Sequence, residues 1–277
     1  MTTIVDALTP LEALTRDLRT AARTLSDREA RFLVDNYYIM QDDRKRAHNQ
    51  TLMLEGSEEP HLVLQWLAEN SRRLEDNIKR ALQAYAEGQA VGQWLLSITG
   101  IGPVISAGLI SYIPIEQTPS ASALWAYAGL APGQRREKGA KLTYNPSLKV
   151  LCWKAGESFV KFQNHPNDHY GRYYAQRKLV EQERNSQGLY AEQSHAALTN
   201  KRYGADTEAF KWYNQGLLPP AHIHARAKRW AVKLFLSHFW EVAYTLHYGE
   251  APSLRPYVFD RLGHRGYIPI PNWEMGE

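Results

Sequence analysis

The feature that most constrains this chain is a long charge-free run whose middle is broken by glycine and proline. No charged residue lies between Glu87 and Glu116, and Gly100, Gly102 and Pro103 stand close together inside the run. The run is long enough to span a bilayer. However, the breaks fall at its centre, polar residues are spread along it, and it has no basic flank. The sequence therefore predicts that the run turns back on itself and that the protein does not span a membrane.

Two glycines one residue apart also occur in nucleotide-binding loops. The dinucleotide-binding pattern needs a third glycine at position 105, which is isoleucine, and it needs a strand before the loop, whereas the preceding segment has a helical pattern. The phosphate-loop pattern that ends in Gly-Lys-Ser/Thr is absent as well. Both kinds of nucleotide loop are excluded.

A helix-hairpin-helix fits the run better. Apolar Leu95 and Ile98 end a first helix, and the glycines turn the chain where a side chain would obstruct both the backbone angles and a ligand. Proline suits the first position of the second helix, whose free amides and positive end can hold a phosphate without contacting a base. The candidate phosphate-binding residues are Gly100, Ile101, Gly102, Pro103 and Val104. The alternative is a tight turn between core helices that touches no nucleic acid.

Two basic segments extend this candidate site. Five cations and one acid lie between Gly133 and Lys149, and the helix expected over 221–248 has no acid between His222 and Trp240. Its cations at spacings of three and four share one face. The candidate contacts with a nucleic acid are Arg135, Arg136, Lys138, Lys141, Lys149, Arg226, Arg229 and Lys233. A solvated charged face is the alternative; the net charge of +4 and pI of about 9.0 favour an anionic partner.

The remaining pattern predicts an all-α fold without strands. Ser26-Asp27-Arg28-Glu29 forms a capping box that starts a helix. Leu64, Leu67, Leu74, Ile78 and Tyr85 fall close to a seven-residue repeat, which predicts either a helical hairpin packed on the core or a coiled coil that forms a homodimer. We expect a helical region over 1–90, a helix-hairpin-helix domain over 91–250 and a Pro/Gly-rich tail over 251–277.

Within the second domain, residues 164–220 form a polar insertion. We expect a surface helix over 170–185 and tyrosine and tryptophan side chains over 164–213 that stack on unpaired bases. The single cysteine, Cys152, excludes an intrachain disulfide, and the charged first 25 residues do not fit a signal peptide. A cytoplasmic location is the expectation.

Four segments together resemble one known family. They are ITGIGPVISAGLIS, ALWAYAGLAPGQRREKGAK, NPSLKVLCWKAGESFVK and AKRWAVKLFLSHFW. They are similar to the C-terminal domain of the insertion-sequence transposases related to the Piv and MooV DNA invertases, over roughly residues 60–250. The resemblance implies DNA as the partner and a helix-hairpin-helix fold.

The resemblance also implies two catalytic elements, and at both this sequence departs from the family pattern. Family members carry an N-terminal RuvC-like nuclease domain with four metal-binding acids, and a nucleophilic serine in the loop after Gly-Leu-x-Pro. Here the N-terminus is helical, and Arg136-Glu137-Lys138-Gly139 stands at the serine position, which leaves Ser147 as a weak displaced candidate. We therefore expect no catalytic residue, no metal ligand and no cofactor, with Mg²⁺ needed only if a nuclease activity exists.

The prediction is a DNA-binding protein of transposase origin that contacts phosphates and lacks its own catalytic centre. Two alternatives stay open. One is an active compact transposase or recombinase that uses a nuclease subunit or an RNA guide in trans. The other is an interaction protein that binds no nucleic acid. RNA is an alternative partner to DNA, because phosphate contacts do not distinguish the two.

Overall fold

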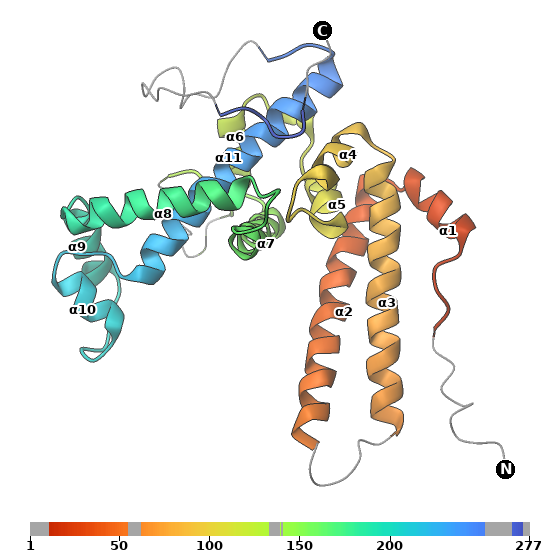
Figure 1. Ribbon diagram of the computed structural model, residues 1–277, viewed down its shortest axis with the longest axis horizontal. Helices are drawn as coiled ribbons and strands as arrows, with labels where there is room; N and C mark the ends of the chain where they lie inside the picture. The colour runs from red at the N-terminus through yellow and green to blue at the C-terminus, as the bar shows by residue number, and fades with distance from the viewer. Residues whose placement is uncertain (1–10, 55–61, 133–138, 140, 253–267, 274–277) are drawn as a thin grey trace. The chain divides into compact units, whose positions relative to one another are not determined.

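The computed structural model describes residues 11–54, 62–132, 139, 141–252 and 268–273. Eleven α-helices and two short 3-10 helices make up this part of the chain, and none of its residues is in a strand (Figure 1). The all-α prediction is confirmed. The basic loop residues Arg135, Arg136 and Lys138, and most of the tail, lie outside the described residues.

The chain divides into two compact units. Unit 1 comprises Met1–Ser97 and Gly102–Pro114, and unit 2 comprises Ile98–Ile101 and Ile115–Glu277. The limits expected from the sequence, 1–90, 91–250 and 251–277, stay predictions.

Unit 1 is built on a pair of long helices, α2 (Asp27–Leu54) and α3 (Leu62–Glu87), which run side by side (Figure 1). The predicted capping box starts α2: the amide of Ser26 donates to Glu29 at 2.8 Å, and the amide of Glu29 donates back to the Ser26 hydroxyl at 3.3 Å. Short α1 (Arg16–Ala21) and the 3-10 turn Ala22–Thr24 pack against α3.

The charge-free run forms two short helices in unit 1, α4 (Ala90–Ser97) and α5 (Pro103–Tyr112). Helix α5 packs against both α2 and α3, and eight of its ten residues are buried. Tyr112 at its end donates a hydrogen bond of 3.1 Å to Asp35. The run is therefore the apolar centre of unit 1. Across the described part of the chain, no helix combines the length and the apolar character that a membrane crossing needs.

The helical hairpin expected from the seven-residue repeat is present, since α2 and α3 pair within one chain. Tyr85 of the repeat is buried, whereas Leu67 and Leu74 are exposed. Homodimer formation through this region stays a prediction.

Unit 2 is arranged around its longest helix, α11 (Pro220–Tyr248). This helix contacts α6 (Ala121–Tyr127), α7 (Pro146–Phe162) and α8 (Tyr170–Ser186). Its buried side chains include Phe235, Phe239 and Trp240, and the Trp240 indole donates to the carbonyl of Thr118 at 2.8 Å. Two further helices, α9 (Ala191–Asn200) and α10 (Glu208–Asn214), pack on each other.

Helix α8 is not the simple surface helix that its polar sequence predicts. It packs along α11 and buries one face, which includes Tyr170, Tyr174, Glu181 and Asn185. Each of these polar groups has a hydrogen-bond partner: Tyr170 and Tyr174 bond to His238 and His224 of α11, and the Asn185 amide exchanges two bonds with the backbone of Leu218. Because the polar groups are satisfied, a polar sequence can form a buried face.

Candidate nucleic-acid interface

The turn between α4 and α5 has the backbone that its two glycines predict. Gly100 has φ +92°, a left-handed conformation that glycine adopts freely. Gly102 has φ −95° and caps the start of α5, and a Cβ added there would meet no atom within 4 Å. Gly100 therefore serves the turn itself, whereas Gly102 leaves the space in front of the helix open.

The start of α5 offers unbonded amides at this open space. The first amides of a helix have no partner inside it, and in α5 these belong to Val104 and Ile105, because Pro103 has none. The aligned peptide dipoles make this helix end partly positive. The Ile101 side chain is buried, whereas Gly100 and Gly102 on either side of it are partly exposed.

Four of the predicted cations of unit 2 line a cleft of about 570 Å³. Helix α11 contributes one side of it, and the segment Gly129–Pro132, which carries the Gly-Leu-Ala-Pro motif, contributes another. The lining side chains are Lys149 of α7, Arg177 and Glu181 of α8, Gln193 of α9, and Arg226, Arg229, Trp230 and Lys233 of α11. Among the described residues, five cations and one carboxylate thus line the cleft.

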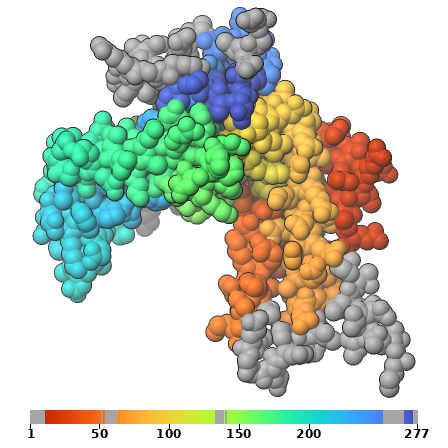
Figure 2. All heavy atoms as spheres, viewed as in Figure 1, coloured from red at the N-terminus to blue at the C-terminus, as the bar shows by residue number. Residues whose placement is uncertain are grey.

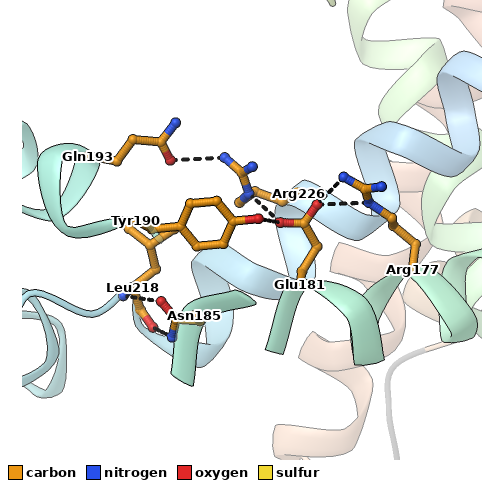
Figure 3. A network of polar contacts seen from close by, with 7 residues as sticks. All are labelled: Arg177, Glu181, Asn185, Tyr190, Gln193, Leu218 and Arg226. Carbon is orange, nitrogen blue, oxygen red and sulfur yellow. Dashed lines mark hydrogen bonds and ion pairs between the residues drawn. The ribbon is translucent and has the colours of Figure 1, made fainter. Parts of the chain in front are cut away.

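Glu181 organises two of these cations (Figure 3). Its side chain is only 2% exposed, and it accepts bonds from Arg177 at 2.5 Å and from Arg226 at 2.8 Å. The hydroxyl of Tyr190 donates to the same carboxylate. Burial alone raises the pKa of Glu181, but the bonds from Tyr190 and Arg226, together with the charge of Arg177, lower it overall.

Arg226 is held from three sides. Besides Glu181, its guanidinium donates to the Gln193 side chain at 2.9 Å, and it lies 4.2 Å from the centre of the Tyr190 ring. These contacts hold the planar guanidinium in place at the wall of the cleft. A side chain that is already held loses less conformational entropy when a ligand binds than a flexible one does.

Three cations of the cleft have no ion pair among the described residues: Lys149, Arg229 and Lys233. The ammonium of Lys149 lies 4.4 Å from the Tyr144 ring centre, and that of Lys233 lies 4.1 Å from the Trp125 ring centre. Burial, with a contribution from the neighbouring charge of Arg229, lowers the pKa of Lys233. Arg229 is exposed. The charges of this cleft are therefore only partly neutralised by the protein.

The other sequence candidates lie elsewhere. Lys141 and Ser147 are exposed, Ser147 in the first turn of α7, and neither lines the cleft. The expectation that aromatic side chains of 164–213 stack on bases is wrong for Tyr170, Tyr174, Tyr190 and Tyr213, which are buried. Within the described residues no group of three or more His, Cys, Asp or Glu could hold a metal ion.

Sequence reasoning missed Arg177, Glu181, Gln193 and Trp230 as cleft residues. Only Arg177 and Glu181 carried a signal, since a spacing of four places opposite charges together on a helix. Their approach to α11 depends on how α8 packs, which the local sequence does not encode.

Comparison with known protein families gives a match to part of the chain. Residues 92–170 match the model of the transposase IS116/IS110/IS902 family, a stretch that contains the glycine turn, the Gly-Leu-Ala-Pro segment and α7. No curated protein and no solved structure gives a significant match. This part of the chain is therefore related to transposases.

Proposed function

We propose that this protein binds DNA through phosphate contacts, as a DNA-binding protein of transposase origin without a catalytic centre of its own. The observation that carries the proposal is the cleft of unit 2. Four cations that the sequence singled out, Lys149, Arg226, Arg229 and Lys233, come from two helices to line it, next to the Gly-Leu-Ala-Pro segment of the transposase-related stretch. Converging cations with few counter-charges form a site for a polyanion.

The glycine turn supports a second phosphate contact. In a helix-hairpin-helix the amides at the start of the second helix bind a backbone phosphate, and α5 has such amides with open space at Gly102. These contacts are to the backbone, so we expect binding that depends little on base sequence. No step of this proposal requires a metal ion or a nucleophilic serine.

The test measures fluorescence anisotropy of labelled duplex DNA, single strands, four-way junctions and structured RNA over a salt series. Arg229→Gln removes an exposed cleft cation, and Arg184→Gln on α8 is the matched control, since Arg184 is also exposed but does not line the cleft. Loss of one phosphate contact reduces the slope of log affinity against log salt by about 0.9. We expect that change for Arg229→Gln and none for Arg184→Gln.

Equal binding by both variants and the wild type would contradict the cleft as a phosphate site. The order of affinities among the probes decides between DNA and RNA. Adding Mg²⁺ to the same samples tests the alternative of an active transposase, since cleaved or joined strands would require a catalytic centre that the proposal denies.

A further inference from the structure

A second group of cations lies in unit 1, apart from every residue that the sequence singled out. It lines a cavity of about 410 Å³ between α1 and α3. Its members, here called the arginine cluster, are Arg16, Arg19, Arg23 and Arg80. All four are exposed.

Spacing and packing fix this arrangement. Arg16, Arg19 and Arg23 are three and four residues apart, so that α1 and the following turn present them on one face. Asn77 of α3 accepts a bond from the Leu14 amide at 2.9 Å and donates to the Glu12 carbonyl at 2.8 Å, just before α1 begins.

A small apolar cluster completes the attachment. Ala22 packs with Ala81 and Ala84 of α3, and Leu14 and Leu25 pack against them. Helix α1 therefore lies against α3 (Figure 2). Its arginines line the same cavity as Arg80 of α3. The four guanidinium groups are brought together by the fold and not by one helix alone.

Among the described residues the arginine cluster makes no ion pair, whereas two other arginines of the same unit have an acidic partner. Arg44 pairs with Glu75 at 2.5 Å and Arg73 with Glu69 at 3.0 Å, whereas none of the four arginines has an ion pair among the described residues. Glu87, the one acid among the described residues that line the cavity, accepts a bond from Gln83 at 2.7 Å. Four like charges held together repel one another, and an anionic ligand removes that cost.

We propose that the arginine cluster binds the phosphodiester backbone of DNA, as a contact of unit 1 that is separate from the cleft and the glycine turn. The inference rests on the proposed function, because it takes the same ligand. The planar guanidinium matches two phosphate oxygens at once. Because all four side chains are exposed to water, one phosphate would be held weakly, while a strand offers several in a row and releases its counter-ions on binding.

The first test is the affinity of the full chain for duplex DNA. Arg19→Gln/Arg23→Gln removes two cations of the cluster, and Lys45→Gln/Arg46→Gln on α2 removes two exposed cations elsewhere in unit 1. For two lost phosphate contacts the salt slope falls by about 1.8, with roughly a tenfold or greater loss of affinity at 0.1 M salt. The control pair keeps wild-type binding, and circular dichroism checks that both variants are folded.

The second test places a photo-crosslinker in the cluster. Cys152 is the only cysteine and is buried, and burial raises the pKa of its thiol to about 12, so an introduced exposed cysteine is the single reactive thiol. Thr20→Cys lies among the arginines. Thr199→Cys on α9 is the matched control, because both threonines are exposed and both donate to the carbonyl four residues before them. An azidophenyl label at position 20 crosslinks to bound duplex, and the label at 199 does not.

The outcomes separate this inference from the proposed function. Unchanged affinity of Arg19→Gln/Arg23→Gln, or crosslinking at 20 no stronger than at 199, overturns the arginine cluster as a contact while the cleft can still respond to Arg229→Gln. A loss with Arg19→Gln/Arg23→Gln but none with Arg229→Gln overturns the cleft and keeps the cluster. Competition by inorganic phosphate at concentrations equal to the DNA phosphates assigns the cluster to a small anion and overturns the inference.

Discussion

Ser158 of α7 donates a hydrogen bond of 2.5 Å to the carbonyl oxygen of Gly100. A residue 58 positions further along the chain thus bonds to the backbone of the turn at Gly100. The two glycines of the turn consequently have different environments: a Cβ at Gly100 would come within 3.1 Å of the Ser158 hydroxyl, whereas one at Gly102 would meet nothing. Substitutions at the two positions therefore separate an effect on the stability of the protein from an effect on DNA binding.

Gly100→Ala is expected to destabilise the protein by about 1–2 kcal/mol, because an L-residue at φ +92° crowds its own carbonyl. Gly102→Ala is expected to cost less than about 1 kcal/mol, since φ is −95° and only the capping preference changes. Urea unfolding of the two variants measures the difference.

In the DNA-binding assay the roles of these variants reverse. Gly102→Ala places a methyl group in the open space in front of the α5 amides, so that we expect weaker DNA binding from a well-folded protein. If Gly102→Ala binds as the wild type does, the turn is a packing device and the phosphate contact at α5 is refuted.

Glu181→Gln replaces the buried carboxylate by a neutral amide and leaves Arg177 and Arg226 without their counter-charge. We expect it to destabilise unit 2 by about 3 kcal/mol. The pH dependence follows from the sign of the shift. The pKa of Glu181 is lower in the folded protein than its ordinary value of 4.5, so its stabilisation is fully present above about pH 4.5 and is lost as the pH falls below that value.

Chemical unfolding at a series of pH values between 7 and 3 tests this expectation. The difference in unfolding free energy between the wild type and Glu181→Gln should shrink as the pH falls below 4.5. A constant difference over the whole range would mean that the carboxylate charge contributes nothing.

His238 is the second pH-dependent group of unit 2. Burial lowers its pKa to about 3, and its Nε2 lies 3.1 Å from the carbonyl of Ile268. A carbonyl only accepts, so Nε2 carries the proton, Nδ1 is the acceptor, and the Tyr170 hydroxyl donates to it at 2.8 Å. Tyr170→Phe leaves this buried acceptor without a partner and should cost about 1–3 kcal/mol.

The lowered pKa of His238 also predicts a decline of stability in weak acid. The unfolded chain takes up a proton near the ordinary value of 6.5 and the folded protein does not until about pH 3, so stability falls as the pH drops from 6.5 to 3. NMR titration of the imidazole is the direct measurement. A His238 signal that titrates near pH 6.5 in the folded protein would contradict this.

The sequence could predict the parts of the fold that depend on local pattern. The capping box at Ser26, the proline at the start of α5 and the basic face of α11 each follow from spacing within a few residues. It could not predict that polar α8 buries a face, because this depends on partners such as His224, His238 and Leu218 that lie 33–68 residues away.

Dependence on partners far away in the sequence also explains why parts of the candidate sites could not be predicted. Cations on α11 were visible as a stripe, but the carboxylate that holds Arg226 comes from α8, 45 positions away. The arginine cluster of unit 1 went unnoticed since Arg16, Arg19 and Arg23 look like one solvated helix face until α3 supplies Arg80.

Arg226→Lys tests whether the geometry of the cleft matters beyond its charge. The guanidinium bonds Glu181 and Gln193 at once and stacks on the Tyr190 ring, a set of contacts that a single ammonium cannot reproduce. We expect a loss of about 1–2 kcal/mol in unfolding free energy from the weakened charge-assisted bonds. We also expect weaker DNA binding at unchanged net charge.

Lys233→Arg also keeps the charge and is the control, because Lys233 makes a cation–π contact with Trp125 that arginine can retain. Equal DNA affinity for both variants would show that charge alone accounts for binding in the cleft.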